Sequence, residues 1–144
     1  MLSQTAEYAL RAMVTLAASP DEARTALQIA REAKIPADYL AKILGSLGRA
    51  GLVGAQRGRG GGYKATRPAE HVTVLDVVDA VDPLRRIETC PLGLAAHERK
   101  LCPLHRKLDE AIRSVQEAFA ATTLASLAGE SFMSDEEKHR DVVA

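Results

Sequence analysis

The chain has 144 residues, 47% of them hydrophobic, and its equal numbers of acidic and basic side chains give a formal net charge of zero. This length and apolar content predict one compact domain with an appendage, and no apolar run approaches the roughly 18 residues that a membrane-spanning helix needs. A helical pattern begins directly at the amino terminus without an export signal, and the chain has only two cysteines, so we expect a cytoplasmic protein without structural disulfides.

Three short helices are predicted in the first third of the chain. The first covers residues 3–18, where apolar side chains recur at helical spacing. The second begins at Thr25, and Gln28 three residues later completes a capping-box pattern. The third runs over residues 36–48 and closes at Gly51, which suits a helix C-terminal cap.

A β-hairpin and a fourth helix are predicted next. Residues 52–56 form the first strand, residues 58–62 are a loop that needs glycine backbones, and residues 63–66 return as the second strand. Thr73 then caps a short apolar helix that Pro83 stops.

The last predicted helix begins at Pro103 and runs to about residue 121. Its apolar side chains recur at spacings of three and four, and a helix of this kind, leaving a small domain, often packs against a twin. We therefore expect a homodimer. The seam consists of Leu104, Leu108, Ala111, Ile112, Val115 and Phe119.

Together these elements predict a mostly helical fold with a small β-hairpin. Residues 1–82 would form a winged helix-turn-helix domain, and residues 83–102 a sensor loop. Residues 103–128 would form the long dimerisation helix, and residues 129–144 a flexible tail.

Positive charge is concentrated in the part of the chain that would meet a polyanion. Residues 31–67 contain eight Lys and Arg residues against two Asp and Glu. In a winged helix-turn-helix, the third helix enters the major groove of double-stranded DNA and the hairpin reaches the backbone or the minor groove. The candidate DNA-contacting residues are Gln28, Tyr39, Lys42, Ser46, Arg49, Arg57, Arg59, Gly60 and Lys64.

These elements also permit other interpretations. A nucleotide phosphate loop at residues 58–62 would need Gly-Lys-Ser/Thr or a strand–loop–helix context, and neither is present. A plain surface hairpin stays open, as does a winged domain that binds a protein instead of DNA. An enzyme is not expected, because no Ser/His/Asp set or carboxylate pair gathers on one predicted face. Neither a membrane nor a small-molecule substrate is expected as a partner.

Both cysteines of the chain lie in one short segment together with two histidines. Cys90, His97, Cys102 and His105 are concentrated within 16 residues, which suggests a metal or redox centre. A Zn²⁺ site made by Cys90, Cys102, His105 and one more ligand is chemically reasonable. A redox-active thiol pair and inert cysteines stay open as well.

Several motifs resemble a known family of regulators. They are Tyr8-Ala9-Leu10-Arg11, Tyr39-Leu40, Leu52-Val53 and the run Arg57-Gly58-Arg59-Gly60-Gly61-Gly62-Tyr63. They are similar to those of the Rrf-type winged-helix regulators, the IscR/NsrR-like family, over about residues 1–128. The resemblance implies a homodimeric transcription factor. We call the predicted hairpin of residues 52–66 the wing. The family usually has proline in the loop of the wing, at the position where this chain has Arg59.

The resemblance also implies a ligand set for a redox-active iron–sulfur cluster on which DNA affinity would depend. Cluster-binding members carry three cysteines in this loop; Cys90 and Cys102 match the outer two, whereas Ala96 occupies the middle position. His105 matches a family histidine. Glu7 stands where some members carry an acidic ligand that comes from the other subunit.

The expected cofactor is therefore a [2Fe–2S] cluster held by Cys90, Cys102, His105 and Glu7 of the partner subunit. His97 is the alternative to His105 or Glu7. A [4Fe–4S] cluster, Zn²⁺ and no metal remain alternatives. An ordinary ion pair of Glu7 with Arg11, four residues later on the same helix, stays open too.

Overall fold

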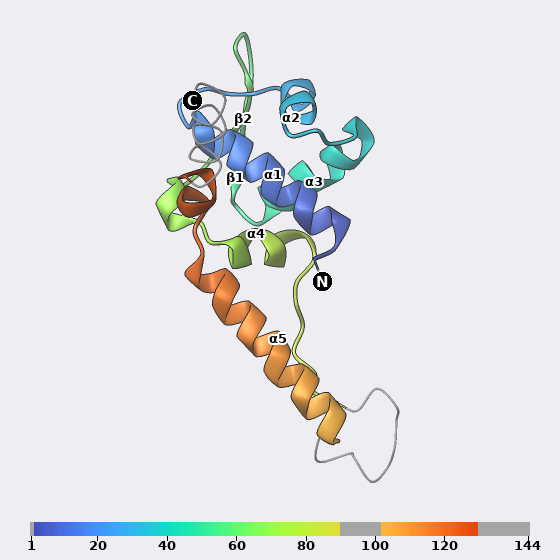
Figure 1. Cartoon of the computed structure of the whole chain (residues 1–144). Helices are drawn as coiled ribbons and strands as arrows, with labels where there is room; N and C mark the ends of the chain where they lie inside the picture. Colours follow the sequence, from blue (N-terminus) through green and yellow to red (C-terminus); the bar gives the residue numbers. More distant parts are fainter. Residues whose placement is uncertain (1, 90–101, 130–144) are drawn as a thin grey trace, which may run out of the picture.

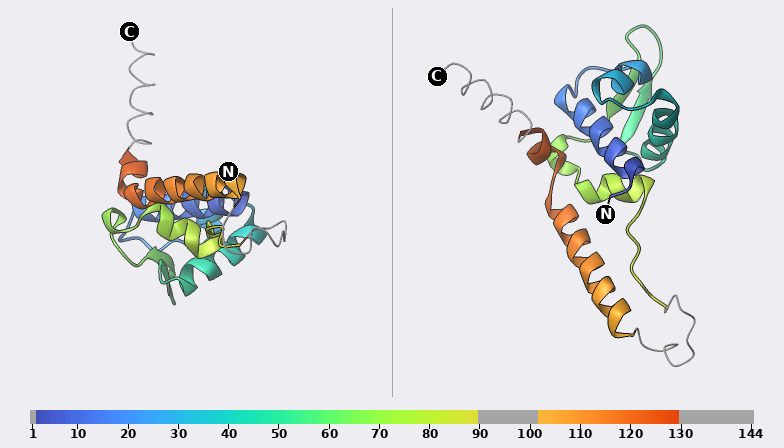
Figure 2. Two further views of the ribbon diagram at one scale, coloured as in Figure 1. Left: turned by 90° about the horizontal axis from the view of Figure 1, so that it is seen from below. Right: turned by 45° about the vertical axis from the view of Figure 1, so that its right-hand side comes forward.

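The computed structural model describes residues 2–89 and 102–129. A helical body lies at the centre of the molecule (Figure 1). A β-hairpin projects from one end of the body, and one long helix extends from the other end (Figures 1 and 2). None of the described helices has both the length and the apolar character required to cross a membrane.

Three helices build the body. They are α1 (Gln4–Ala18), α2 (Ala26–Glu32) and α3 (Ala37–Arg49). The predicted capping box at the start of α2 is formed, with the Thr25 side chain accepting from the Gln28 N–H and the Gln28 side chain accepting from the Thr25 N–H. Pro36 is the N-cap of α3 and not its first residue, since its ψ of 133° is not helical.

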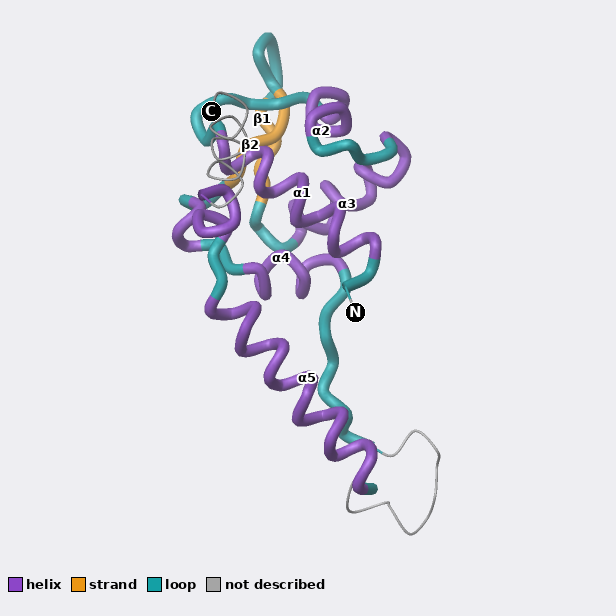
Figure 3. Tube along the Cα trace, viewed as in Figure 1, coloured by secondary structure: helices purple, strands orange, loops and turns teal. Residues whose placement is uncertain are grey.

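The hairpin consists of β1 (Val53–Gln56) and β2 (Gly62–Ala65), which pair antiparallel in a two-stranded sheet. The register places Gly54 opposite Lys64 and Ala55 opposite Tyr63. Figure 3 shows the hairpin beside the end of α1, with its loop pointing away from the body.

The chain then returns to the body and leaves it again. A short 3-10 helix, η1 (Ala69–His71), leads into α4 (Val74–Val81), whose N-cap Thr73 forms a capping box with Asp76. The long helix α5 covers Pro103–Ala121, as predicted. Residues 124–129 are a last helical segment of the described chain.

The core lies between α1, α2, α3 and α4. Met13, Leu16, Ile29, Leu40 and Leu47 are almost fully buried there. Ala6 on α1 and Val74 and Val78 on α4 form a second small apolar cluster, against which Phe119 of α5 packs.

The seam predicted for α5 is exposed near the N-terminal end of the helix and packed against the body near its C-terminal end. Phe119 packs against the chain's own body, whereas Leu104 and Leu108 are 63% and 46% exposed. At about 100° per residue, Leu104, Leu108, Ala111 and Val115 form one stripe. Residues 105, 109, 112 and 116 lie on another face.

Candidate functional site: a basic wing, a recognition helix and a thiol–imidazole pair

The exposed side of α3 carries several of the predicted DNA-contacting residues. Lys42 and Arg49 are exposed. The Arg49 Nη2 donates to Ser46 Oγ at 3.2 Å, which orients both side chains. Tyr39 is 48% exposed, and its ring forms a T-shaped contact with Tyr8 of α1, with 5.9 Å between the ring centroids. Tyr39 therefore has a structural contact as well as an exposed edge.

Gln28 has a structural role at the start of α2. Its Oε1 accepts the Thr25 N–H at 2.8 Å. The side-chain amide nitrogen is then the group with which Gln28 can hydrogen-bond to a DNA base or phosphate.

The wing tip presents two arginines on a glycine loop. Arg57, Arg59 and Gly60 are exposed. Gly58 and Gly60 have φ values of 99° and 70°, in the left-handed region that glycine adopts without a steric penalty. The backbone at the tip can therefore turn sharply while both guanidinium groups stay in solvent. Lys64 lies on β2, is half-buried, and is not part of the tip.

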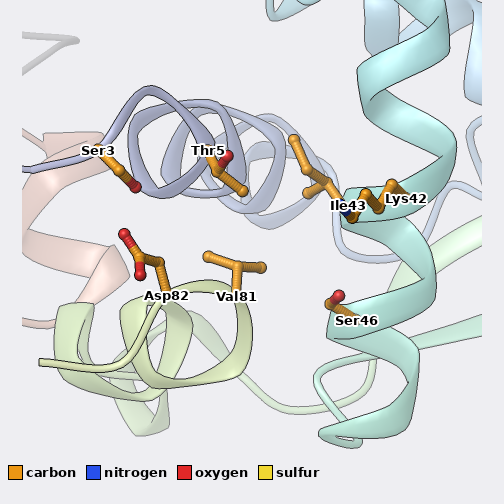
Figure 4. Close-up of a pocket in the computed structure, with 7 residues that line it drawn as sticks. All are labelled: Ser3, Thr5, Lys42, Ile43, Ser46, Val81 and Asp82. Atoms are coloured by element: carbon orange, nitrogen blue, oxygen red, sulfur yellow. The ribbon is translucent and has the colours of Figure 1, made fainter. Parts of the chain in front are cut away.

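A cavity of about 270 Å³ opens beside α3, between the N-terminal end of α1 and the C-terminal end of α4 (Figure 4). Its charged residues are Lys42 and Asp82, on opposite sides, and Ile43 forms part of its wall. Lys42 and Ser46 therefore face this cavity as well as the surface expected to meet DNA. The lining residues are Ser3, Thr5, Lys42, Ile43, Ser46, Val81 and Asp82.

A thiol and an imidazole meet at the start of α5. Cys102 is the N-cap of the helix, and its Sγ lies 2.9 Å from His105 Nδ1. His105 is only 8% exposed. Two of the predicted ligands are thus held together by one helical turn. This pair lies at the end of the molecule opposite the wing, as the positions of α5 and the hairpin show (Figure 2).

The segment that connects α4 to the thiol region runs along α5 and is fastened to it; we call residues 84–87 the strap. Asp109 accepts from Arg86 Nε at 2.6 Å and from Arg86 Nη2 at 2.5 Å, and also from the Ile87 N–H at 2.9 Å. Gln116 donates from Nε2 to the Leu84 carbonyl at 2.7 Å. The Arg86 hydrogen bond, followed by that from Ile87, lowers the pKa of Asp109 to about 2.

The fourth predicted ligand is not near this pair within one subunit. Glu7 lies on α1 in the body, and among the described residues no group of three or more His, Cys, Asp or Glu side chains could hold a metal ion. Among the described residues Glu7 and Arg11 form no ion pair, and the Arg11 guanidinium lies over the Tyr8 ring, 5.6 Å from its centroid. Cys90 and His97 lie outside the described residues.

Some residues that organise these sites have no signal in the local sequence. Asp109 and Arg86 are 23 positions apart, and the cavity joins residues from three helices. Arg24, which contacts the hairpin, stands alone in the loop between α1 and α2. Only the tertiary contacts reveal these partners. The sequence signal for Arg24 is its position as a basic residue between the first two predicted helices.

Comparison with known proteins agrees with this arrangement. Residues 2–130 match the Rrf2 family, described as an iron-dependent transcriptional regulator. A protein of Aquifex aeolicus (strain VF5) named as an HTH-type transcriptional regulator is 29% identical over 142 residues, which cover 96% of this chain and 95% of that protein.

Solved structures with this fold include CymR, the global cysteine regulator of B. subtilis. It is 26% identical with a TM-score of 0.74, covering 90% of this chain and 97% of that chain. T. potens IscR has a TM-score of 0.75 at 21% identity, covering 91% and 88%, and at that identity the likeness concerns the fold alone. Because the family match spans most of the chain, the protein belongs to the Rrf2 family of transcriptional regulators.

Proposed function

We propose that the protein is a cytoplasmic, homodimeric regulator that binds an operator in double-stranded DNA through α3 and the wing. The observation that carries this proposal is the wing tip, where Arg57 and Arg59 are exposed on a glycine-rich loop. Because the glycines have no side chains, the loop can approach the DNA backbone closely. Each guanidinium can neutralise a phosphate and release a counterion. As a member of a family of transcriptional regulators, the chain is not an enzyme, in agreement with the sequence analysis.

The DNA contact can be measured through its salt dependence. The variant carrying Arg57→Ala and Arg59→Ala should bind a mixed-sequence duplex more weakly, and its slope of log affinity against log salt should be smaller by about two. Arg113→Ala on α5 removes an exposed arginine far from the wing and should leave the slope unchanged. If the wild-type protein does not bind duplex DNA, or the double variant keeps its slope, the proposed role of the wing is wrong.

We infer that α5 joins the two subunits. Leu104, Leu108 and Ala111 of the stripe are exposed and Val115 is half-buried, while the other face of α5 is occupied by the strap and the core. Pairing two copies would remove this apolar surface from water. It would also place two copies of α3 in one dimer, as a two-fold symmetric operator requires.

The sensing region is proposed at the N-terminal end of α5. A thiolate and an imidazole are accepted ligands of iron–sulfur clusters and of Zn²⁺, and Cys102 and His105 are already held together, so this part of the donor set fits either group. The proposed [2Fe–2S] ligands are Cys90, Cys102, His105 and Glu7 of the partner subunit, with His97 as the alternative. A bound cluster would supply one-electron redox chemistry.

The strap offers a route from this region to the DNA-reading helix. It is hydrogen-bonded along α5 and continues from α4, whose last turn lines the cavity shared with Lys42 and Ser46. A rearrangement at Cys102 would therefore shift α4 against α3. Such coupling between the two ends of the molecule does not depend on which signal acts at Cys102.

A second candidate is a regulator without a cluster, which responds to oxidation of Cys90 and Cys102 or binds Zn²⁺. The same close Cys102–His105 pair favours it, because a thiol and an imidazole nitrogen held side by side are the donor types of a Zn²⁺ site. Visible absorption, iron and zinc analysis, and thiol counting on anaerobically purified protein separate these candidates. Visible absorption with bound iron would support the cluster, and a colourless iron-free protein would remove it.

The ligand roles can be tested with paired histidine variants. His105→Ala should reduce the bound iron or zinc strongly, whereas His97→Ala should leave it nearly unchanged if His105 is the ligand. Circular dichroism provides the control for folding, because His105 is buried and its removal can also disturb the start of α5. The reverse order of metal loss would assign the role to His97.

A further inference from the structure

The loop between α1 and α2 holds the wing through a single residue. The Arg24 N–H donates to the Tyr63 carbonyl at 3.0 Å, and the Tyr63 N–H donates to the Arg24 carbonyl at 2.7 Å. Arg24 thereby acts as a one-residue third strand on the outer edge of β2. This contact matters because a two-stranded hairpin of four-residue strands is marginally stable by itself.

The side chain of Arg24 fixes the same residue to the helices. Its Nη1 pairs with Glu32, the last residue of α2, and its Nη2 donates to Ser19 Oγ, at the end of α1, at 2.9 Å. The side chain is only 16% exposed, and among the described residues its buried Nε has no hydrogen-bond partner. Because Arg24 is only partly buried and its partner Glu32 is 46% exposed, the ion pair contributes little stability by itself, and this favours a role in specifying geometry.

The glycine run of the wing is adapted to this contact. Gly62 has a φ of 146°, and a Cβ at this position would lie 2.4 Å from the Arg24 carbonyl oxygen. Gly58 and Gly60 form the turn, whereas Gly62 lets β2 approach the loop that carries Arg24. Two different needs for glycine therefore meet in one short run.

Accordingly, we propose that Arg24 is the positioning residue of the wing: its Glu32 and Ser19 contacts set the orientation in which Arg57 and Arg59 meet DNA. Arg24 itself does not reach DNA, because its guanidinium is committed to these two partners. The proposal rests on the DNA-binding function proposed above. It adds that wing affinity depends on an ion pair between the α1–α2 loop and the end of α2.

Whether Arg24 holds the wing in place can be tested without DNA. Trypsin cleaves after Arg57 and Arg59, and a wing released from Arg24 should be cut there several-fold faster, as followed by the masses of the fragments. Arg24→Met and the milder Glu32→Gln should both show this, and Arg113→Met on α5 is the matched control. Cleavage that rises equally at all sites would indicate general destabilisation and would overturn the proposal.

The second measurement is a double-mutant cycle on binding to a mixed-sequence duplex. In the wild-type background Arg59→Ala should lower the salt slope by about one, whereas in the Glu32→Gln or Arg24→Met background it should change the slope far less. A purely structural Arg24 would give additive effects, which would contradict the proposal. If the wild-type protein fails to bind DNA, the proposed function fails. The proteolysis result still decides whether Arg24 holds the wing in place.

Discussion

At the scale of single residues, Gly62 is a position where the backbone itself limits the sequence. Replacing it by alanine would force a Cβ to within 2.4 Å of the Arg24 carbonyl oxygen at a φ of 146°. We expect Gly62→Ala to lower the free energy of unfolding by roughly 1–3 kcal/mol or more, because the strain and the overlap act together. Urea unfolding followed by circular dichroism measures this change.

Gly48 provides a matched glycine control. It lies within α3, where a Cβ would make only an ordinary contact of 4.0 Å with Val53. Gly48→Ala should therefore be neutral or raise the free energy of unfolding by up to about 1 kcal/mol, as expected for a glycine inside a helix. Equal effects of the two substitutions would mean that the approach of β2 to Arg24 does not require glycine.

At the scale of elements, the fastening of the strap to α5 depends on one carboxylate. The Arg86 hydrogen bond lowers the pKa of Asp109 to about 2, from its ordinary value of 3.8. The folded state therefore favours the ionised form, so its contribution is complete above about pH 4 and is lost as the pH falls through about 2. In urea unfolding between pH 5 and pH 2, Asp109→Asn should lose less stability on acidification than the wild type.

Asp79 on α4 gives a control of opposite sign. Burial, and secondly the charge of Asp76, raise the pKa of Asp79, so the folded state disfavours its ionised form. Its destabilising effect is present at neutral pH and disappears below the ordinary value. Asp79→Asn should therefore be neutral or stabilising at pH 7, whereas Asp109→Asn should be destabilising there. Matching behaviour of the two variants would show that general charge, and not the Arg86 contact, controls the acid response.

At the scale of the whole molecule, α5 is expected to hold two subunits together through its exposed apolar stripe. Leu108 lies within the stripe and is 46% exposed. Burial of one leucine contributes about 1.5–3 kcal/mol, and a two-fold interface contains the residue twice. Leu108→Glu should therefore raise the dimer dissociation constant at least about 100-fold. Sedimentation velocity over a range of protein concentrations measures it.

Arg113→Glu serves as the control for this experiment. Arg113 is exposed on a different side of α5, where it lies 3.9 Å from Glu117, so a new carboxylate there does not enter the stripe. The mass of this variant should remain that of the wild type. If Leu108→Glu also keeps the wild-type mass, α5 does not provide the dimer interface.

Local sequence signals predicted most of the elements, because caps and periodicity act over a few residues. Thr25 with Gln28, Gly51 as a left-handed residue after α3, and the bounds of α5 all agree with the prediction. The order of elements and the glycine-tipped hairpin were enough to predict the fold class, which is confirmed. The DNA-contacting residues and the ligand set stay predictions.

The sequence by itself determined the helices, the hairpin and the presence of two thiols beside two imidazoles, since these depend on residue type and near neighbours. Only the tertiary structure decided which distant groups meet. It paired Arg24 with Tyr63 and Glu32, Arg86 with Asp109, and kept Glu7 apart from Cys102 within one subunit. The physical reason is that such contacts depend on how packed helices orient their side chains, and a linear pattern does not contain that orientation.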